Sequence, residues 1–214
     1  MKRIQEKFLE TLEQAIGLED MSVLEVGCGN GARSVEIAKR CKSLTAIEPN
    51  EVQLRCAKEL EVQNIDFRLG SAEALDFAPE SFDVVIFTLS FHHVPQTLMS
   101  VAINEALRVV RQNGFIVFLE PAVTGSFFEA EIRFDACDGD EREEKRIAYE
   151  AMSSHTGLVP VKELPDETIF QFDSLDDFIQ SMCPKANLDQ LEPFLRTHHY
   201  ILRAKRRINI YRPR

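Results

Sequence analysis

Residues Val23 to Gly31 read VLEVGCGNG, and this stretch decides the fold class of the 214-residue chain. Its first four residues are apolar except for Glu25, a pattern typical of a short buried strand. Gly27, Gly29 and Gly31 follow, and the next segment, ARSVEIAKRC, has helical periodicity. Glycine permits positive φ and close approach of a ligand to the backbone, and a helix N-terminus offers unpaired N–H groups. The stretch therefore predicts a nucleotide-binding turn between a strand and a helix.

Composition restricts the class of protein. The chain is 44% hydrophobic and 28% charged, which is ordinary for a globular domain. Its net charge of −10 argues against a general nucleic-acid binder, because phosphate contacts need clustered lysine and arginine. The five cysteines form no CxxC pair, so we expect free thiols in a reducing cytoplasm and no metal site. We see neither a signal peptide nor an apolar run long enough for a membrane span, and expect a cytoplasmic protein.

Apolar runs alternate with helical periodicity up to residue 120. FDVVIFT (82–88) is nearly all apolar, which is typical of a parallel strand buried on both faces. Strands that alternate with helices predict right-handed crossovers and an open parallel sheet with helices on both faces, an α/β fold. The predicted strands are 22–26, 44–48, 64–69, 82–88 and 115–120, and the predicted helices are 31–41, 51–61, 71–75 (a short turn) and 95–111.

The segments outside this core have other patterns. Residues 2–17 have the spacing of an amphipathic helix, a candidate lid or homodimer interface. After Glu120 we expect an acidic helical region (125–157), extended segments (159–172), two further helices (175–182 and 188–205) and a last strand (207–212). We therefore expect one domain over residues 1–214, with an N-terminal helix (1–19), a cofactor-binding core (20–120), a helical lid (121–158) and C-terminal strands and helices (159–214).

The glycine turn alone leaves two cofactors open. Gly27, Gly29 and Ala32 also satisfy GxGxxA, the fingerprint of dinucleotide-binding proteins. Glu48 ends the second predicted strand, where its carboxylate can accept hydrogen bonds from both hydroxyls of a ribose. Both NAD and S-adenosylmethionine carry such a ribose. The glycine turn and Glu48 are therefore consistent with two classes of enzyme, a nicotinamide-dependent oxidoreductase and a methyltransferase.

Residues 20–120 as a whole resemble the class I S-adenosylmethionine-dependent methyltransferases, in particular the group that includes the ubiquinone/menaquinone-biosynthesis enzymes. The resemblance implies a seven-stranded, mostly parallel Rossmann-like sheet whose last strand, RINIYR (207–212), is antiparallel. It also implies S-adenosylmethionine as cofactor and a small-molecule methyl acceptor. Five motifs carry it in order: VLEVGCGNG (23–31), AIEPN (46–50), LGSAEALDF (69–77), FDVVIFTLSFHHV (82–94) and LRVVRQNGFIVFLEP (107–121).

The same resemblance implies which residues contact the cofactor. The three glycines of the turn lie along the methionine and ribose, Glu48 holds the ribose hydroxyls, and Ser71 lies near the adenine. The family commonly has aspartate where this chain has Ser71, which weakens the expected recognition of the adenine amino group. The implied cofactor-binding residues are Glu25, Gly27, Cys28, Gly29, Gly31, Glu48, Pro49, Ser71, Ala72, Thr88 and Leu89.

His92 and His93 are the candidate catalytic residues. They follow the fourth predicted strand at the cofactor edge, and histidine titrates near neutral pH. A base is needed only if the acceptor must lose a proton, and packing in the core or ordering of the loop before Pro95 would also explain either residue. We expect a methyltransferase that acts on a small molecule, with the lid selecting the acceptor. The alternatives are the oxidoreductase, for which no Tyr-x-x-x-Lys pair is present, and a non-catalytic cofactor-binding domain.

Overall fold

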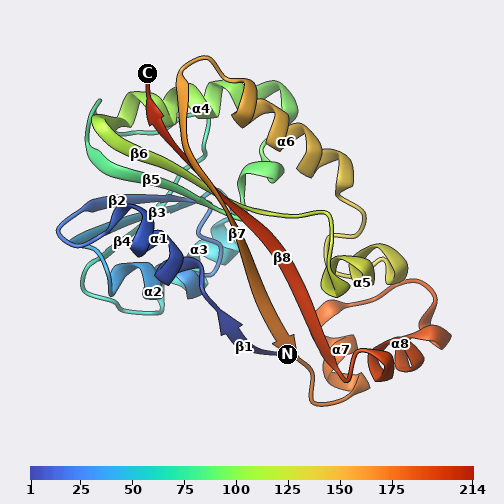
Figure 1. The fold of residues 1–214 in the computed structure, drawn as a ribbon. Helices are drawn as coiled ribbons and strands as arrows, with labels where there is room; N and C mark the ends of the chain where they lie inside the picture. Colours follow the sequence, from blue (N-terminus) through green and yellow to red (C-terminus); the bar gives the residue numbers. More distant parts are fainter.

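Eight strands form one twisted sheet in the computed structural model, which describes residues 1–214 (Figure 1). Their order across the sheet is β1-β7-β8-β6-β5-β2-β3-β4. Neighbours from β6 to β4 are parallel, whereas the β6–β8, β8–β7 and β7–β1 pairs are antiparallel. The predicted mostly parallel sheet with an antiparallel last strand is thus confirmed, but it has eight strands where seven were predicted. The strands are β1 (Lys2–Glu6), β2 (Ser22–Val26), β3 (Ser43–Glu48), β4 (Ile65–Leu69), β5 (Phe82–Thr88), β6 (Val110–Pro121), β7 (Leu158–Gln171) and β8 (Ile201–Pro213).

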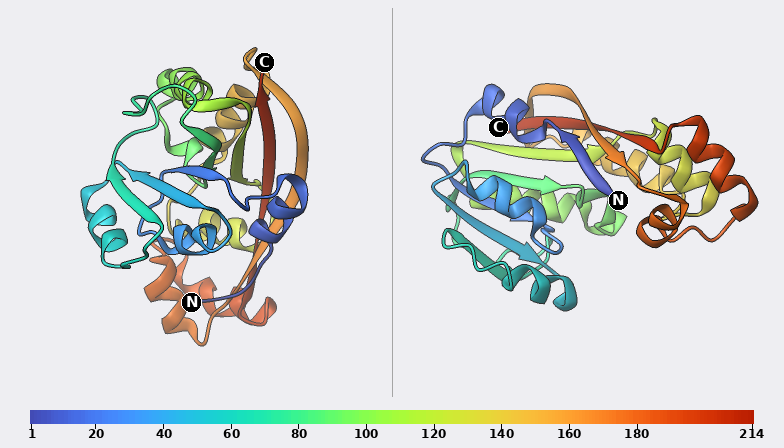
Figure 2. Two further views of the ribbon diagram at one scale, coloured as in Figure 1. Left: turned by 90° about the vertical axis from the view of Figure 1, so that its left-hand side faces the viewer. Right: turned by 90° about the horizontal axis from the view of Figure 1, so that it is seen from below.

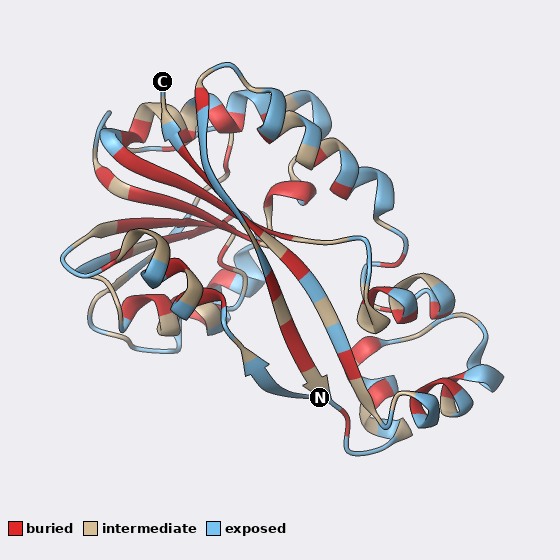
Figure 3. Ribbon diagram, viewed as in Figure 1, coloured by how far each residue is buried: buried red, intermediate tan, exposed pale blue.

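Helices cover both faces of the sheet, as the apolar strands require. In β5, Val84 and Ile86 pack with helices α1 and α2, while Val85 and Phe87 pack with α4 and α6. This split follows from the two-residue period of a strand. Figure 3 shows the central strands buried and the outer helix faces exposed. The helices are α1 (Phe8–Ile16), α2 (Ala32–Ala38), α3 (Glu51–Lys58), α4 (Met99–Val109), α5 (Ser126–Phe134), α6 (Arg142–Ser154), α7 (Leu175–Met182) and α8 (Leu191–Thr197).

A third apolar core lies at the end of the long β7–β8 hairpin. Figures 1 and 2 show α5, α7 and α8 grouped there, beyond the parallel strands. Aromatic side chains join these helices: the rings of Phe134 and Phe194 are 5.1 Å apart, as are those of Phe172 and Phe178. Burial of several phenylalanines supplies much of the apolar area that stabilises this small group of helices.

The structure corrects three local predictions. Residues 2–17 are not one helix: β1 pairs with the end of β7, and only Phe8–Ile16 is helical. The predicted helix over 188–205 ends at Thr197, because Ile201–Arg206 extend β8 along β7. Residues 71–75 form no helix, and the N–H of Leu75 donates to the Glu105 carboxylate at 2.9 Å instead. In each case hydrogen-bond partners distant in sequence override the local pattern.

The helix predicted over 95–111 is also shorter than expected. The chain makes two 3₁₀ turns, η1 (Phe91–His93) and η2 (Gln96–Leu98), before α4 begins at Met99. α4 ends at Val109, and Val110 already belongs to β6. A third 3₁₀ turn, η3 (Leu188–Gln190), precedes α8. None of the helices is both long enough and apolar enough to cross a membrane.

Candidate cofactor and acceptor site

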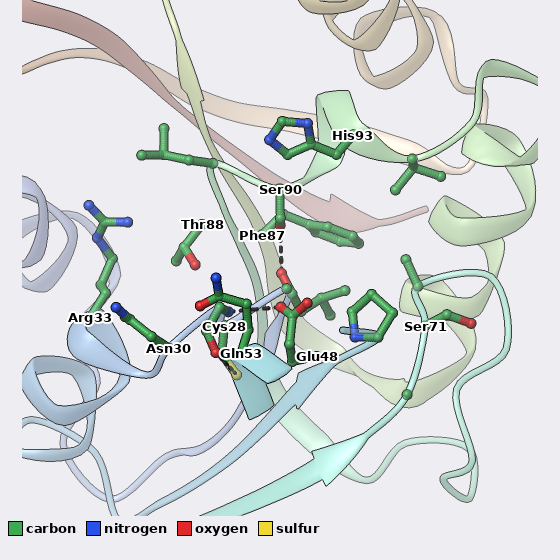
Figure 4. Close-up of a pocket in the computed structure, with 18 of the residues that line it drawn as sticks. Cys28, Asn30, Arg33, Glu48, Gln53, Ser71, Phe87, Thr88, Ser90 and His93 are labelled. Atoms are coloured by element: carbon green, nitrogen blue, oxygen red, sulfur yellow. Dashed lines mark hydrogen bonds between the residues drawn. The ribbon is translucent and has the colours of Figure 1, made fainter. Parts of the chain in front are cut away.

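A cavity of about 660 Å³ lies beyond the carboxyl ends of the parallel strands. The loops after β2, β3, β4 and β5 all line it, and this is where open α/β sheets bind ligands. In Figure 4, Arg33 and Asn30 lie at one end of this cavity, Ser71 lies at the other, and Glu48 lies between them. The cavity is therefore elongated across the edge of the sheet, as an extended nucleotide-like ligand requires.

The glycine turn forms one wall of the cavity. Gly27, Gly29 and Gly31 all have positive φ, at 76°, 56° and 78°. A Cβ atom on Gly27 would lie 2.4 Å from the Cβ of Ser90, whereas one on Gly29 would meet no atom within 4 Å. Ser90 Oγ donates to the Val26 carbonyl at 2.6 Å, a bond drawn in Figure 4. Gly27 thus permits the ends of β2 and β5 to approach, and Gly29 leaves its backbone open to a ligand.

Glu48 is fixed in the cavity by backbone donors. Its Oε2 accepts from the Gly29 N–H at 2.8 Å and its Oε1 from the Asn50 N–H at 3.0 Å. Asn50 caps α3 by accepting from the N–H groups of Val52 and Gln53. Because the Asn50 N–H bonds Glu48, no capping box forms, and Gln53 lines the cavity instead. Each carboxylate oxygen of Glu48 keeps acceptor capacity for a hydroxyl group.

Ten of the sequence-predicted site residues line this one cavity, and three do not. Glu25 is fully buried, and its oxygens accept from Ser34 Oγ at 2.5 Å and Thr88 Oγ1 at 2.7 Å. Burial raises the pKa of Glu25. Gly31 faces α3, where a Cβ would lie 3.0 Å from Ala57, and the third exception is His92. The ten are Gly27, Cys28, Gly29, Glu48, Pro49, Ser71, Ala72, Thr88, Leu89 and His93.

The two histidines have different environments. His93 lines the cavity and its side chain is 51% exposed, whereas the ring of His92 is buried and its Nδ1 is hydrogen-bonded to the Glu120 carboxylate. Burial alone would lower the pKa of His92, but the charge and hydrogen bond of Glu120 outweigh it, so this pKa is raised. Burial and the neighbouring His92 lower the pKa of His93. Only His93 can therefore touch a molecule in the cavity directly.

Residues 121–158, the segment expected to form a lid, contribute charged residues next to this histidine pair. Glu141 Oε1 lies 3.5 Å from His93 Nδ1, and the other carboxylate oxygen lies 3.2 Å from Lys145 Nζ. Lys145 is buried, 3.7 Å from Glu131 Oε2. Burial raises the pKa of Glu131 to about 7. No spacing in the sequence signals this cluster, because its members come from η1, from α5 and from the start of α6, where Glu141 is the N-cap residue.

Sequence analysis also missed two arginines at the cavity. Arg33, in the first turn of α2, and Arg3, on β1, both line it. Arg33 Nη2 pairs with Glu6 at 2.9 Å, but its buried Nε has no hydrogen-bond partner. Because Arg33 lines the cavity, its guanidinium can pair with an anionic group of a ligand. Only the pairing of β1 with β7 brings Arg3 and Glu6 to this place.

Comparison with known proteins agrees with this geometry. The sequence profile of the family described as "Methyltransferase domain" matches residues 24–118, from β2 into β6. Residues 24–118 are a methyltransferase domain. Its fold is the Rossmann-like class I methyltransferase fold, and membership of this family implies S-adenosylmethionine as cofactor. The lid, the β7–β8 hairpin and α7 and α8 lie outside the matched range.

The methyltransferase domain has curated relatives of similar sequence. The ubiquinone biosynthesis O-methyltransferase of Pseudomonas fluorescens is 34% identical over 111 residues, which are 50% of this chain and 47% of that protein. The ubiquinone/menaquinone biosynthesis C-methyltransferase UbiE of Rickettsia bellii is 34% identical over 110 residues, 46% of this chain and 44% of that protein. The chain thus spans about half the length of the curated relatives it matches.

Structural similarity extends beyond the methyltransferase domain. The crystal structure of a putative methyltransferase from Bacillus halodurans superposes with a TM-score of 0.67. It covers 95% of this chain and 97% of that one, at 17% sequence identity. The lid and the C-terminal hairpin therefore belong to the same overall fold as the matched domain.

Proposed function

We propose that this protein transfers a methyl group from S-adenosylmethionine to a small-molecule acceptor. One observation carries the proposal: within a methyltransferase domain, the Glu48 carboxylate faces the cavity and is held by the N–H groups of Gly29 and Asn50. Two acceptor oxygens fixed beside a glycine turn match the two hydroxyls of a ribose. A cavity of about 660 Å³ is in the range of small-molecule sites.

The ends of the cavity suit the two ends of this cofactor. Arg33, with its unpaired buried Nε, lies at the end where the methionine carboxylate would be held. Ser71 lies at the opposite end, where the adenine would be held, and the neighbouring Ala72 also lines the cavity. Glu48 lies between them, beside the ribose. We propose that the predicted residues that line the cavity contact the cofactor, with the exception of His93. Arg33 is proposed as a further cofactor contact, whereas Glu25 and Gly31 are not.

Catalysis would depend mainly on positioning. S-adenosylmethionine supplies a methyl group on a positively charged sulfur, and displacement in line with that bond needs an acceptor atom held opposite it. Holding two reactants in line can remove several kcal/mol from a barrier. His93 is the proposed acceptor contact, since it lines the cavity. His92, buried against Glu120, acts through the position of the η1 turn rather than by direct contact.

We further propose a cytoplasmic protein that acts on a small molecule rather than on nucleic acid or at a membrane. The net charge of −10 and the five free cysteines support this. A homodimer through the N-terminal segment is also proposed, because Ile4 is 50% exposed on the edge strand β1. Gel filtration with light scattering tests the dimer.

Calorimetry with S-adenosylmethionine, its demethylated product and NADH tests the cofactor. We expect binding of the first two, and a loss of about 1–3 kcal/mol in Glu48→Ala, which is about 5–150-fold in affinity. Glu51→Ala, on the exposed face of α3, is the matched control and should bind normally. Preference for NADH would overturn the proposal.

Transfer itself needs a second measurement. The protein is incubated with methyl-labelled S-adenosylmethionine and small-molecule fractions of a cell extract, and the labelled product is identified by mass spectrometry. We expect a labelled small molecule whose formation His93→Ala slows. Cofactor binding without transfer to any acceptor would support a non-catalytic cofactor-binding domain instead.

A further inference from the structure

Three potential ligand atoms converge where η1 meets the lid. His92, His93 and Glu141 each offer one ligand atom, and these three atoms all lie within 4.8 Å of one another. Glu141 Oε2 is 3.8 Å from His92 Nε2, and Glu141 Oε1 is 3.5 Å from His93 Nδ1. Two ligand atoms on a tetrahedral zinc ion, each about 2.0–2.1 Å from the metal, lie about 3.3 Å apart. Small side-chain rotations would therefore bring the three atoms to ligand distance.

Glu120 orients one of these ligands. Its carboxylate is hydrogen-bonded to His92 Nδ1, and its other oxygen accepts from the Phe91 N–H at 3.0 Å. A neutral imidazole that donates through Nδ1 has its free lone pair on Nε2, the atom that faces Glu141. Carboxylates that hold the far nitrogen of a histidine in this way are the usual support of metal-ligating histidines. The pair of His92 and Glu120 is thus already arranged for coordination.

The charge around these atoms favours a cation. The carboxyl groups of Glu120 and Glu141 contact the histidine pair, and that of Glu131 lies beyond Lys145. Lys145 is the one lysine or arginine within 4 Å of these three carboxyl groups. Lys145 contacts both Glu131 and Glu141, so it keeps an anionic partner when Glu141 turns toward an ion. A divalent cation would balance the remaining negative charge.

We propose that His92, His93 and Glu141 form a binding site for a divalent first-row transition ion, with Zn²⁺ as the ion that this donor set suits best. Two imidazoles and one carboxylate leave a coordination position free for water or another ligand. Because the half-exposed His93 lines the cavity, the ion would lie at the cavity wall and could enter from there. This proposal rests on the contacts described above and does not depend on the proposed methyl transfer.

Metal binding tests this directly. The full chain is treated with a chelator, dialysed and titrated with Zn²⁺ against a chromophoric chelator. We expect one equivalent to bind, and Glu120→Gln to weaken the affinity by about 10–100-fold. His93→Ala and Glu141→Gln remove ligands and should weaken it more than that. His92 is buried, so the half-exposed His93 is the safer position for a ligand deletion.

Two controls separate this site from accidental binding. His199→Asn alters an exposed histidine outside the cluster, and should bind Zn²⁺ as the unaltered protein does. Cys56 and Cys183 are exposed free thiols, so the protein is also loaded with Co²⁺, and a thiolate charge-transfer band is sought. Less than one equivalent of Zn²⁺, affinity unchanged in His93→Ala and Glu141→Gln, or a thiolate band would each overturn the proposal.

Discussion

Ser90 occupies the space into which a side chain on Gly27 would project, because a Cβ atom there would lie 2.4 Å from the Cβ of Ser90. The contact joins the ends of β2 and β5 at the cavity, and Ser90 also hydrogen-bonds Val26. Gly27 is therefore needed for two reasons, its φ of 76° and this close approach. Gly29, two residues later, is needed only for its positive φ.

Gly27→Ala should destabilise the protein substantially. Overpacking costs about 1–3 kcal/mol, and the left-handed backbone adds roughly 1–2 kcal/mol. Thermal unfolding measures the loss, at about 2–4 °C per kcal/mol for a chain of this size. Gly29→Ala is the control: it has the strain without the clash, so its melting temperature should fall less. The double variant Gly27→Ala/Ser90→Gly should recover part of the loss, and equal destabilisation by both glycine substitutions would contradict the role of the contact.

Arg33→Met should weaken binding of S-adenosylmethionine but not of adenosine. The guanidinium lies at the end of the cavity proposed for the methionine carboxylate, and adenosine has no such group. Hydrogen bonds to charged groups are worth about 1.5–3 kcal/mol, so we expect a loss of about 10–150-fold by calorimetry. Glu6→Gln, which removes the other partner of Arg33, controls for disruption of that ion pair. Equal losses for both ligands would refute the assignment.

Glu6 should stabilise the fold at neutral pH and lose this effect in acid. Burial would raise the pKa of Glu6, but Arg33 and Arg206 outweigh it and hold this pKa at about 2. A carboxyl whose folded pKa is depressed adds stability above its unfolded pKa near 4.5, and that stability disappears as pH falls toward 2. The contribution at pH 7 is about 2–3 kcal/mol.

Urea unfolding of the protein and of Glu6→Gln, at pH 7 and near pH 3, measures this. The difference in free energy of unfolding should be large at pH 7 and should shrink at the lower pH. Asp173→Asn, which alters the exposed Lys2–Asp173 pair near the same strand, should show little difference at either pH. A difference in Glu6→Gln that did not change with pH would contradict the ion-pair explanation.

Arg206→Ala and Arg203→Ala should differ sharply, although both remove an ion-paired arginine from β8. The side chains of Arg206 and Asp166 are 3% and 1% exposed, so truncating Arg206 leaves a buried charge unpaired, at a cost of about 3–5 kcal/mol. Arg203 pairs with Glu167 at the surface, where such pairs contribute about 0–1 kcal/mol. Urea unfolding compares the two variants, and similar stabilities would be inconsistent with a buried pair.

Ten of the thirteen site residues predicted from the sequence line the cavity, because their determinants are local. The strand, glycine turn and helix follow one another in VLEVGCGNG and the residues after it, and Glu48 and Ser71 each follow a strand whose apolar pattern is visible. Glu25 shows the limit of that reasoning. It lies in the same motif, but its side chain points to Ser34 and Thr88 and not to the cavity. Which face a strand residue takes depends on the helix that packs there.

The acceptor side could not be predicted in the same way. Arg3 reaches the cavity, and Glu6 reaches Arg33, because β1 is an edge strand on β7, whereas their local pattern predicts a helix. Glu141 meets His93, and Lys145 meets Glu141, because α6 packs over η1. Neither arrangement has a signal in spacing, since the partners come from opposite parts of the chain.

The sequence by itself determined the parallel core, its order of strands and helices, and the nucleotide-binding turn. These depend on short-range properties: the period of apolar residues, the glycines that permit positive φ, and the Asn50 cap. Only the tertiary structure decided the eighth strand, the surroundings of Arg33 and the cluster of His92, His93 and Glu141. Those features depend on hydrogen-bond and charge partners that the chain brings together only when the β7–β8 hairpin and the lid pack against the core.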